Sequence, residues 1–134
     1  MLVSMGEALV DLVPDPIVGG APLNVAVAAA RLGTPTAFLG RTSSDAHGAM
    51  IRACLRDAGV DTRLVQVGDE PTLRAVVDHG PPVSYRFEGV DTADEFLDEP
   101  SLGSLGHGPH LLHACGLGLF RGQAADRFLA LAQR

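Results

Sequence analysis

The chain has 134 residues, of which 46% are hydrophobic and 19% charged, and its formal net charge is -6. This length is typical of one domain, and the apolar content is enough to build a core, which excludes a disordered chain. The acidic balance argues against nucleic acid or an anionic membrane as the main partner. All ten basic residues are arginine; without lysine, a P-loop and a Schiff-base site are excluded.

No targeting or membrane segment is predicted. The first basic residue is Arg31, so the N-terminus lacks the basic region of a signal peptide. The uncharged run from Pro100 to Phe120 carries too many glycines and histidines for a membrane-spanning helix. Cys54 and Cys115 stand alone without CxxC spacing, which indicates reduced, buried thiols. We therefore predict a soluble cytoplasmic protein.

The first part of the chain predicts two strands and a helix. Leu2–Met5 and Ala8–Val13 are short apolar runs typical of strands. Gly19-Gly20 is a turn signal, and the small apolar residues of Leu23–Leu32 predict a buried helix packed closely on a sheet. A further strand is predicted at Thr36–Leu39.

The middle of the chain predicts one more helix and a group of strands. Asp45 can cap a helix over Ala46–Ala58, whose apolar positions recur at helical spacing. Three strands are predicted to follow, at Leu64–Val67, Thr72–Val77 and Val83–Phe87. The last two are joined by a hairpin-type connection.

The last part, after a loop-rich stretch, predicts a buried strand at Leu111–Cys115 and an amphipathic helix at Ala124–Gln133. Strand–helix alternation at both ends predicts an α/β fold with a mainly parallel sheet flanked by helices, and a separate small antiparallel sheet from the middle strands. The chain stops directly after a helix, where a parallel sheet requires its next strand, so we expect an incomplete fold.

The densest chemical signal is the segment from Gly19 to Asn24. Two glycines allow a ligand to approach the backbone closely, and the first turn of a helix offers free N–H groups. The Asn24 amide both donates and accepts, and Asp11 would add a carboxylate acceptor, so the set suits a polyhydroxyl ligand. From the residues alone, a tight turn before a core helix with Asn24 bonding locally explains the pattern equally well.

Four motifs follow one another in order, and they are Gly6-Glu7 with Asp11, GGAPLNVAVAAARLG from Gly19 to Gly33, GRTSSD-x-x-G from Gly40 to Gly48, and DAGVDT from Asp57 to Thr62. As a set they resemble the N-terminal part of carbohydrate kinases of the PfkB or ribokinase-like family, most of all the fructokinase subgroup. The resemblance implies a ribokinase-like fold in which residues 1–134 form the sugar-binding part of a kinase domain. It also implies a small β lid, with strands within about residues 8–18 and 64–90.

The resemblance further implies ATP-dependent phosphorylation of a sugar hydroxyl with Mg²⁺. The family's sugar-binding positions match Asp11, Gly19, Gly20 and Asn24, and Arg86 matches a lid position near the substrate. An arginine on a strand is also commonly a plain surface residue, so the role of Arg86 stays open. A lid of this kind often pairs with a second subunit, which implies a possible homodimer.

The chain departs from the family pattern in three places. Ser43-Ser44 stands where relatives commonly have Gly-Asp, and the hairpin turn His79–Pro82 is short. The family's Gly-Ala-Gly-Asp motif, whose aspartate is the catalytic base, is absent from the sequence. Asp57–Asp61 does not replace it, because that segment follows a helix instead of opening one. We therefore assign no catalytic residue and expect this chain alone to bind neither ATP nor Mg²⁺ and to be inactive.

The alternative function is a non-catalytic sugar-binding or dimerisation module. A half-fold exposes a sheet edge that can pair with a second copy or with a separately encoded C-terminal half. An oxidoreductase is a weaker alternative, because the glycines of Gly116–Gly118 and Gly122 have the wrong spacing for a dinucleotide fingerprint. The three histidines between 107 and 113 would not converge on a strand, so no metal site is assigned.

Overall fold

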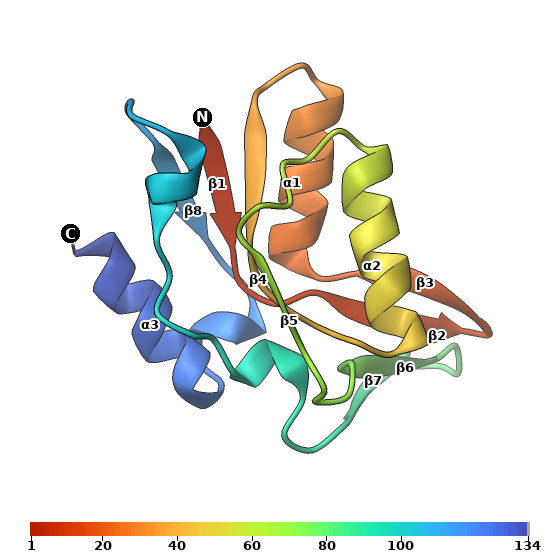
Figure 1. The fold of residues 1–134 in the computed structure, drawn as a ribbon. Helices are drawn as coiled ribbons and strands as arrows, with labels where there is room; N and C mark the ends of the chain where they lie inside the picture. The colour runs from red at the N-terminus through yellow and green to blue at the C-terminus, as the bar shows by residue number, and fades with distance from the viewer. Residues whose placement is uncertain (134) are drawn as a thin grey trace.

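The structure is a computed structural model that describes residues 1–133, and it contains two four-stranded sheets (Figure 1). The main sheet is parallel, with the order β5-β4-β1-β8. Its strands are β1 (Leu2–Met5), β4 (Thr36–Ser43), β5 (Val65–Gly68) and β8 (Leu111–Ala114). The second sheet, here called the lid sheet, has the order β3-β2-β6-β7. Its strands are β2 (Leu9–Val13), β3 (Asp15–Gly19), β6 (Arg74–Asp78) and β7 (Ser84–Glu88).

Helices cover both faces of the main sheet (Figure 1). On one face lie α1 (Ala21–Arg31) and α2 (Ala46–Asp57), and on the other lies α3 (Gly122–Ala132). Three short 3-10 helices complete the fold, η1 (Ala93–Glu95), η2 (Leu102–Leu105) and η3 (Leu117–Leu119). This layering confirms the predicted α/β class with a mainly parallel sheet and a separate small sheet.

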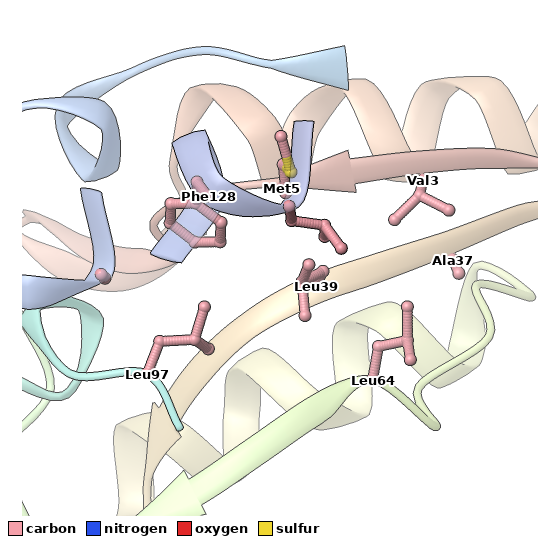
Figure 2. Packing of buried hydrophobic residues seen from close by; sticks show 9 residues of the cluster. Val3, Met5, Ala37, Leu39, Leu64, Leu97 and Phe128 are labelled. Carbon is pink, nitrogen blue, oxygen red and sulfur yellow. The ribbon is translucent and has the colours of Figure 1, made fainter. Parts of the chain in front are cut away.

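The core is split by the main sheet because neighbouring strand residues point to opposite faces. Phe38 of β4 packs with α1 and α2, whereas its neighbours Ala37 and Leu39 face α3. Figure 2 shows the cluster on the α3 side, where Met5 and Leu39 lie near Phe128. Burying a side chain of this size stabilises the fold by about 1.5–3 kcal/mol, so these residues hold α3 on the sheet.

The lid sheet differs from its prediction in two respects. It is mixed instead of antiparallel, since β2 and β6 run parallel while the outer pairs are antiparallel. The strand expected at Leu64–Val67 is β5, which pairs with β4 in the main sheet and does not belong to the lid sheet. The prolines that ended the predicted second strand obscured β3, an edge strand that pairs with β2 alone, where a missing N–H is tolerated.

The helix α1 corrects a further prediction. It packs on the main sheet through Pro22, Leu23 and Ala26, but its outer side, including Ala28, is exposed. The helix therefore lies in an outer layer, and small alanines form its outer surface. Both cysteines are free and half-buried instead of fully buried. No helix within residues 1–133 is long and apolar enough to cross a membrane.

Candidate sugar site

The candidate site lies where the order in which strands join the main sheet reverses, next to β1. From β1 the chain continues to β4 and β5 on one side, and it returns later to place β8 on the other side of β1. Ligands of open parallel sheets bind at the carboxyl ends of the strands at such a switch point. Here Glu7 follows β1, and the segment Gly116–Gly118 follows β8.

A cavity of about 500 Å³ opens at this point, between the main sheet and the lid sheet. Its lining residues come from the strand ends, the start of α1 and the lid, and they are Glu7, Leu9, Asp11, Gly20, Ala21, Ala75, Tyr85, Phe87, Gly116, Leu117 and Phe120. Apolar walls with few polar groups are typical of small-molecule sites. Glu7 and Asp11 are the only charged residues among them.

One face of the lid sheet forms a wall of the cavity. Asp11 pairs with Ala75, and Ala75 pairs with Phe87, so these three side chains lie in one row across β2, β6 and β7. Tyr85 lies on the same face of β7 as Phe87, because side chains alternate along a strand. Tyr85 and Phe87 are at least half exposed, so two aromatic rings are open to a ligand.

Asp11 is the acceptor that the lid presents to the cavity. It is half-buried, and this burial raises the pKa of its carboxyl group above the ordinary value. A side chain on Gly19 would clash with the Asp11 carboxylate. Gly20, the N-cap of α1, has a φ of 111°, and a Cβ there would lie 2.8 Å from the Glu7 carbonyl oxygen. Gly20 is therefore required by its φ and by backbone packing, and Gly19 leaves space for the Asp11 carboxylate.

The backbone of Gly6 and Glu7 is packed against glycines of the neighbouring strand β4 and of the segment that follows β8. A Cβ on Gly40 of β4 would lie 2.6 Å from the Gly6 carbonyl oxygen, and one on Gly118 would lie 2.8 Å from the Glu7 nitrogen. Gly116 has a φ of 83° and faces the Glu7 carboxylate, with no space for a side chain. These contacts fix the floor of the cavity around Glu7.

The structure brings together three of the five residues predicted to bind sugar. Asp11 and Gly20 line the cavity, and Gly19 packs against Asp11. Asn24 lies one turn into α1, is exposed and does not line the cavity. Arg86 lies on the face of β7 opposite Phe87, with 72% of its side chain exposed, and pairs with Glu88 at 3.0 Å. The roles of all five in binding stay predictions.

Sequence reasoning missed Glu7 and the aromatic residues Tyr85, Phe87 and Phe120 as cavity residues. The alternation along Ser84–Glu88 carried a signal, since it puts Tyr85 and Phe87 on the face that Arg86 does not share. For Glu7, the signal was an acidic residue between two apolar runs. The sequence position of Phe120 after β8 does not indicate that it lines the same cavity as the lid residues.

Residues 1–133 contain no set of side chains that fits the metal implied by the resemblance. Within residues 1–133, no three His, Cys, Asp or Glu side chains are grouped so that they could hold a metal ion. His113 instead lies 3.0 Å, through Nδ1, from the Ser4 hydroxyl on the neighbouring strand. No step of a reaction is therefore assigned to a metal held by these residues.

Several known proteins are similar to this chain in sequence. Residues 16–93 match the model of the pfkB family carbohydrate kinases. The chain is 39% identical over 124 residues to the fructokinase of Escherichia coli and 36% identical over 123 residues to that of Vibrio alginolyticus. These alignments include 86% and 85% of this chain, and 40% of each relative, so the chain spans about two fifths of their length.

Two solved structures show the same likeness. The fructokinase of Xylella fastidiosa with bound ATP superimposes with a TM-score of 0.88 and 28% identity. The fructokinase of Vibrio cholerae O395, bound to fructose, ADP and a calcium ion, gives a TM-score of 0.83 and 35% identity. Both comparisons cover 98% of this chain, but only 44% and 46% of those chains. The α/β fold is therefore ribokinase-like, like that of these fructokinases, and the chain belongs to the pfkB family of carbohydrate kinases.

Proposed function

We propose that residues 1–134 are the sugar-binding part of an ATP-dependent carbohydrate kinase, with fructose as its first candidate substrate. The observation that carries the proposal is the cavity between the main sheet and the lid sheet, where the Asp11 carboxylate lies beside open aromatic rings. A carboxylate accepts hydrogen bonds from hydroxyl groups, and aromatic faces pack on the apolar faces of a sugar ring. The fructokinase relatives support the same substrate.

The residues of this chain would bind and orient the sugar. Asp11 would accept a hydrogen bond from a sugar hydroxyl, while Gly20 lines the cavity at the start of α1. Tyr85 and Phe87 of the lid sheet would pack on the sugar and exclude water, which favours transfer to the sugar over transfer to water. Asn24 and Arg86 do not line the cavity. Their predicted contacts with the sugar therefore require a different position of the lid sheet or of the ligand.

In the proposed reaction, a sugar hydroxyl oxygen bonds to the γ-phosphorus of ATP, the bond from that phosphorus to the bridging oxygen breaks, and ADP leaves. The hydroxyl proton passes to a base, and a bound Mg²⁺ would supply neutralising charge beside the phosphates. Neither the base nor the ATP and Mg²⁺ sites are assigned to residues of this chain. We therefore expect the chain to bind sugar weakly and to show no turnover. The location that we propose for the protein is the cytoplasm, as the sequence predicts.

The experiment is a fructose titration of the 134-residue chain followed by amide NMR, after circular dichroism has established that the chain is folded. We expect shifts of amides lining the cavity, with saturation in the millimolar range, and loss of these shifts in Asp11→Asn. The absence of saturable shifts in the folded chain would overturn the proposal. A coupled assay with ATP, Mg²⁺ and fructose should release no ADP, and detectable release would show that the chain carries catalytic groups as well.

A further inference from the structure

Glu7 is a buried carboxylate that has only one partner. The residue is 3% exposed and yet lines the cavity. Its Oε2 accepts a hydrogen bond of 2.8 Å from the backbone N–H of Gly118. Within residues 1–133, its Oε1 has no hydrogen-bond partner, and neither oxygen forms an ion pair.

The free oxygen of Glu7 reaches the cavity, because the fully buried side-chain atom without a partner in residues 1–133 is Nδ1 of His110 and not Oε1 of Glu7. A ligand that displaces water from the cavity therefore has to supply a donor to this oxygen. Removing a charged group from water is costly unless hydrogen bonds replace those to water, and buried polar groups are almost always paired. The segment around it nevertheless fits the carboxylate closely, because a side chain on Gly116 would clash with both oxygens and Gly118 donates to one of them. The site is thus built to hold an acceptor beside the cavity and leaves one oxygen for a donor from outside the chain.

We propose that Glu7 is a second ligand-binding carboxylate, which accepts a hydrogen bond from a ligand hydroxyl through Oε1 and, together with Asp11, restricts the site to uncharged polyhydroxyl ligands. The inference rests on the proposed function, because it names the class of sugar that the same cavity takes. Two acceptors on different walls, one after β1 and one on the lid sheet, can hold different hydroxyl groups of one ligand.

The charge distribution supports this selectivity. The lining residues carry two carboxylates and no arginine or histidine. Arg86 lies on the other face of β7, and Arg121, next to Phe120, pairs with Asp94 and Glu95. The start of α1 contributes about half a positive charge, which does not balance two carboxylates. A sugar acid would therefore meet like charges at short range in a partly buried site, which is an effective means of rejecting it.

The test compares fructose with gluconate, a sugar acid, in the wild-type chain, in Glu7→Gln and in Asp57→Asn. Asp57→Asn is the matched control, since it removes one negative charge from an exposed position at the end of α2. We expect the wild-type chain to bind fructose at least tenfold more tightly than gluconate, as does the control. In Glu7→Gln the carbonyl oxygen keeps the bond from Gly118, fructose affinity falls threefold or more, and the preference for fructose over gluconate shrinks at least threefold.

The outcomes separate this inference from the proposed function. If the folded wild-type chain does not bind fructose, the proposed function fails. If it binds fructose but Glu7→Gln keeps the same preference, or if gluconate binds to neither protein, only the inference about Glu7 is overturned. If Glu7→Gln does not fold, the wild-type chain alone tests the inference. The NMR signal of the Gly118 amide must then shift on fructose binding, and gluconate must bind at least tenfold more weakly than fructose. The lack of either result overturns the inference about Glu7.

Discussion

The carboxylate of Asp45 accepts a hydrogen bond of 2.7 Å from the hydroxyl of Thr72, a residue that precedes β6 of the lid sheet. The same carboxylate accepts the backbone N–H of Thr72 at 3.0 Å and caps α2 by accepting the N–H of Gly48 at 2.7 Å. The sequence predicted the cap alone. One side chain therefore joins the start of α2 to the lid sheet.

Replacing Asp45 by alanine should destabilise the chain more than the loss of an ordinary helix cap. Loss of a cap costs about 1 kcal/mol, and Thr72, which is buried, would lose the acceptor for two donors at about 1–3 kcal/mol. We expect urea unfolding to show a total loss of about 2–4 kcal/mol. The control Ser44→Ala, which removes an exposed hydroxyl, should stay within about 0.5 kcal/mol of the wild type. A loss of equal size in both variants would contradict the joining role of Asp45.

Acid should remove this contribution of Asp45. Burial opposes its ionisation, but the hydrogen bonds from Gly48 and Thr72 outweigh burial and lower the pKa of Asp45 to about 2. An unfolded aspartate has a pKa of about 3.9. Because the folded value is the lower one, the stability due to ionised Asp45 is present above pH 4–5 and is lost as the pH falls toward about 2. The free energies of unfolding of wild type and Asp45→Asn should therefore converge between pH 5 and pH 2, and a constant difference would rule this out.

Arg121 forms a second polar cluster with the acidic residues of η1, which follows β7 along the chain. It pairs with Asp94 at 3.3 Å and with Glu95, and the Asp94 side chain is only 1% exposed. Truncation of one partner of a buried pair costs about 3–5 kcal/mol. Since Arg121 is partly exposed, we expect Arg121→Ala to lose about 2–3 kcal/mol in urea unfolding. Arg127→Ala, which breaks the more exposed pair with Glu99, is the comparison and should lose less than about 1 kcal/mol.

The Arg121 variant should also respond to acid in a distinctive way. Burial raises the pKa of Asp94 even with Arg121 present. A carboxyl group whose folded pKa is raised loses stability as the pH rises from its unfolded value through its folded value. Without Arg121 this effect grows, so Arg121→Ala should gain stability relative to wild type as the pH is lowered from 7 to 5. Adding Asp94→Asn should remove that gain, and persistence of the gain in the double variant would contradict the assignment.

The sequence was sufficient for the layers of the fold and for part of the site. The period of the apolar residues placed the helices and most strands within a few residues, because local pattern and burial agree there, as in α2 with its Asp45 cap. The register between β2 and β6 could not be predicted, since it depends on how a crossover of some sixty residues packs. That register puts Asp11 in a row with Phe87, so the lid wall of the cavity became visible only in three dimensions.

Glu7 shows the same limit from another side. An acidic residue between two strands is usually a solvated turn residue, and its burial results from Gly116 and Gly118, more than one hundred residues later in the chain. Contacts between distant segments are set by strand order in the main sheet, not by local sequence. The glycines after β8 were considered as a dinucleotide loop with the wrong spacing, whereas they fit around the carboxylate of Glu7.

Gly116→Ala should therefore be far more harmful than an equivalent change elsewhere. Both Gly116 and Gly59 have a positive φ, 83° and 79°, so alanine costs about 1–2 kcal/mol of backbone strain at either position. A Cβ at Gly59 meets nothing within 4 Å, whereas one at Gly116 clashes with the buried Glu7 carboxylate. Thermal unfolding should show a greater loss for Gly116→Ala, and its fructose affinity should fall as Glu7 moves. Equal losses in both variants would show that Glu7 yields freely.

Fructose binding should depend on the ionisation of Asp11. Burial raises the pKa of Asp11, so its carboxylate takes up a proton at a higher pH than an exposed aspartate does. The protonated form is a weaker acceptor, and hydrogen bonds to charged groups contribute about 1.5–3 kcal/mol. NMR titrations should therefore show fructose affinity falling as the pH is lowered toward the pKa of Asp11. Asp11→Asn should bind fructose at least tenfold more weakly at pH 7, with a smaller pH dependence.

The stability of the Asp11 variant separates binding from folding. Because the folded pKa of Asp11 is raised, its ionised form destabilises the folded chain at neutral pH relative to a neutral side chain of the same shape. Asp11→Asn should thus unfold at the same urea concentration as wild type, or a higher one, at pH 7 while losing fructose affinity. A variant that loses both stability and affinity would indicate that Asp11 serves to hold the lid sheet in place, and a variant that keeps its affinity would remove Asp11 from the sugar site.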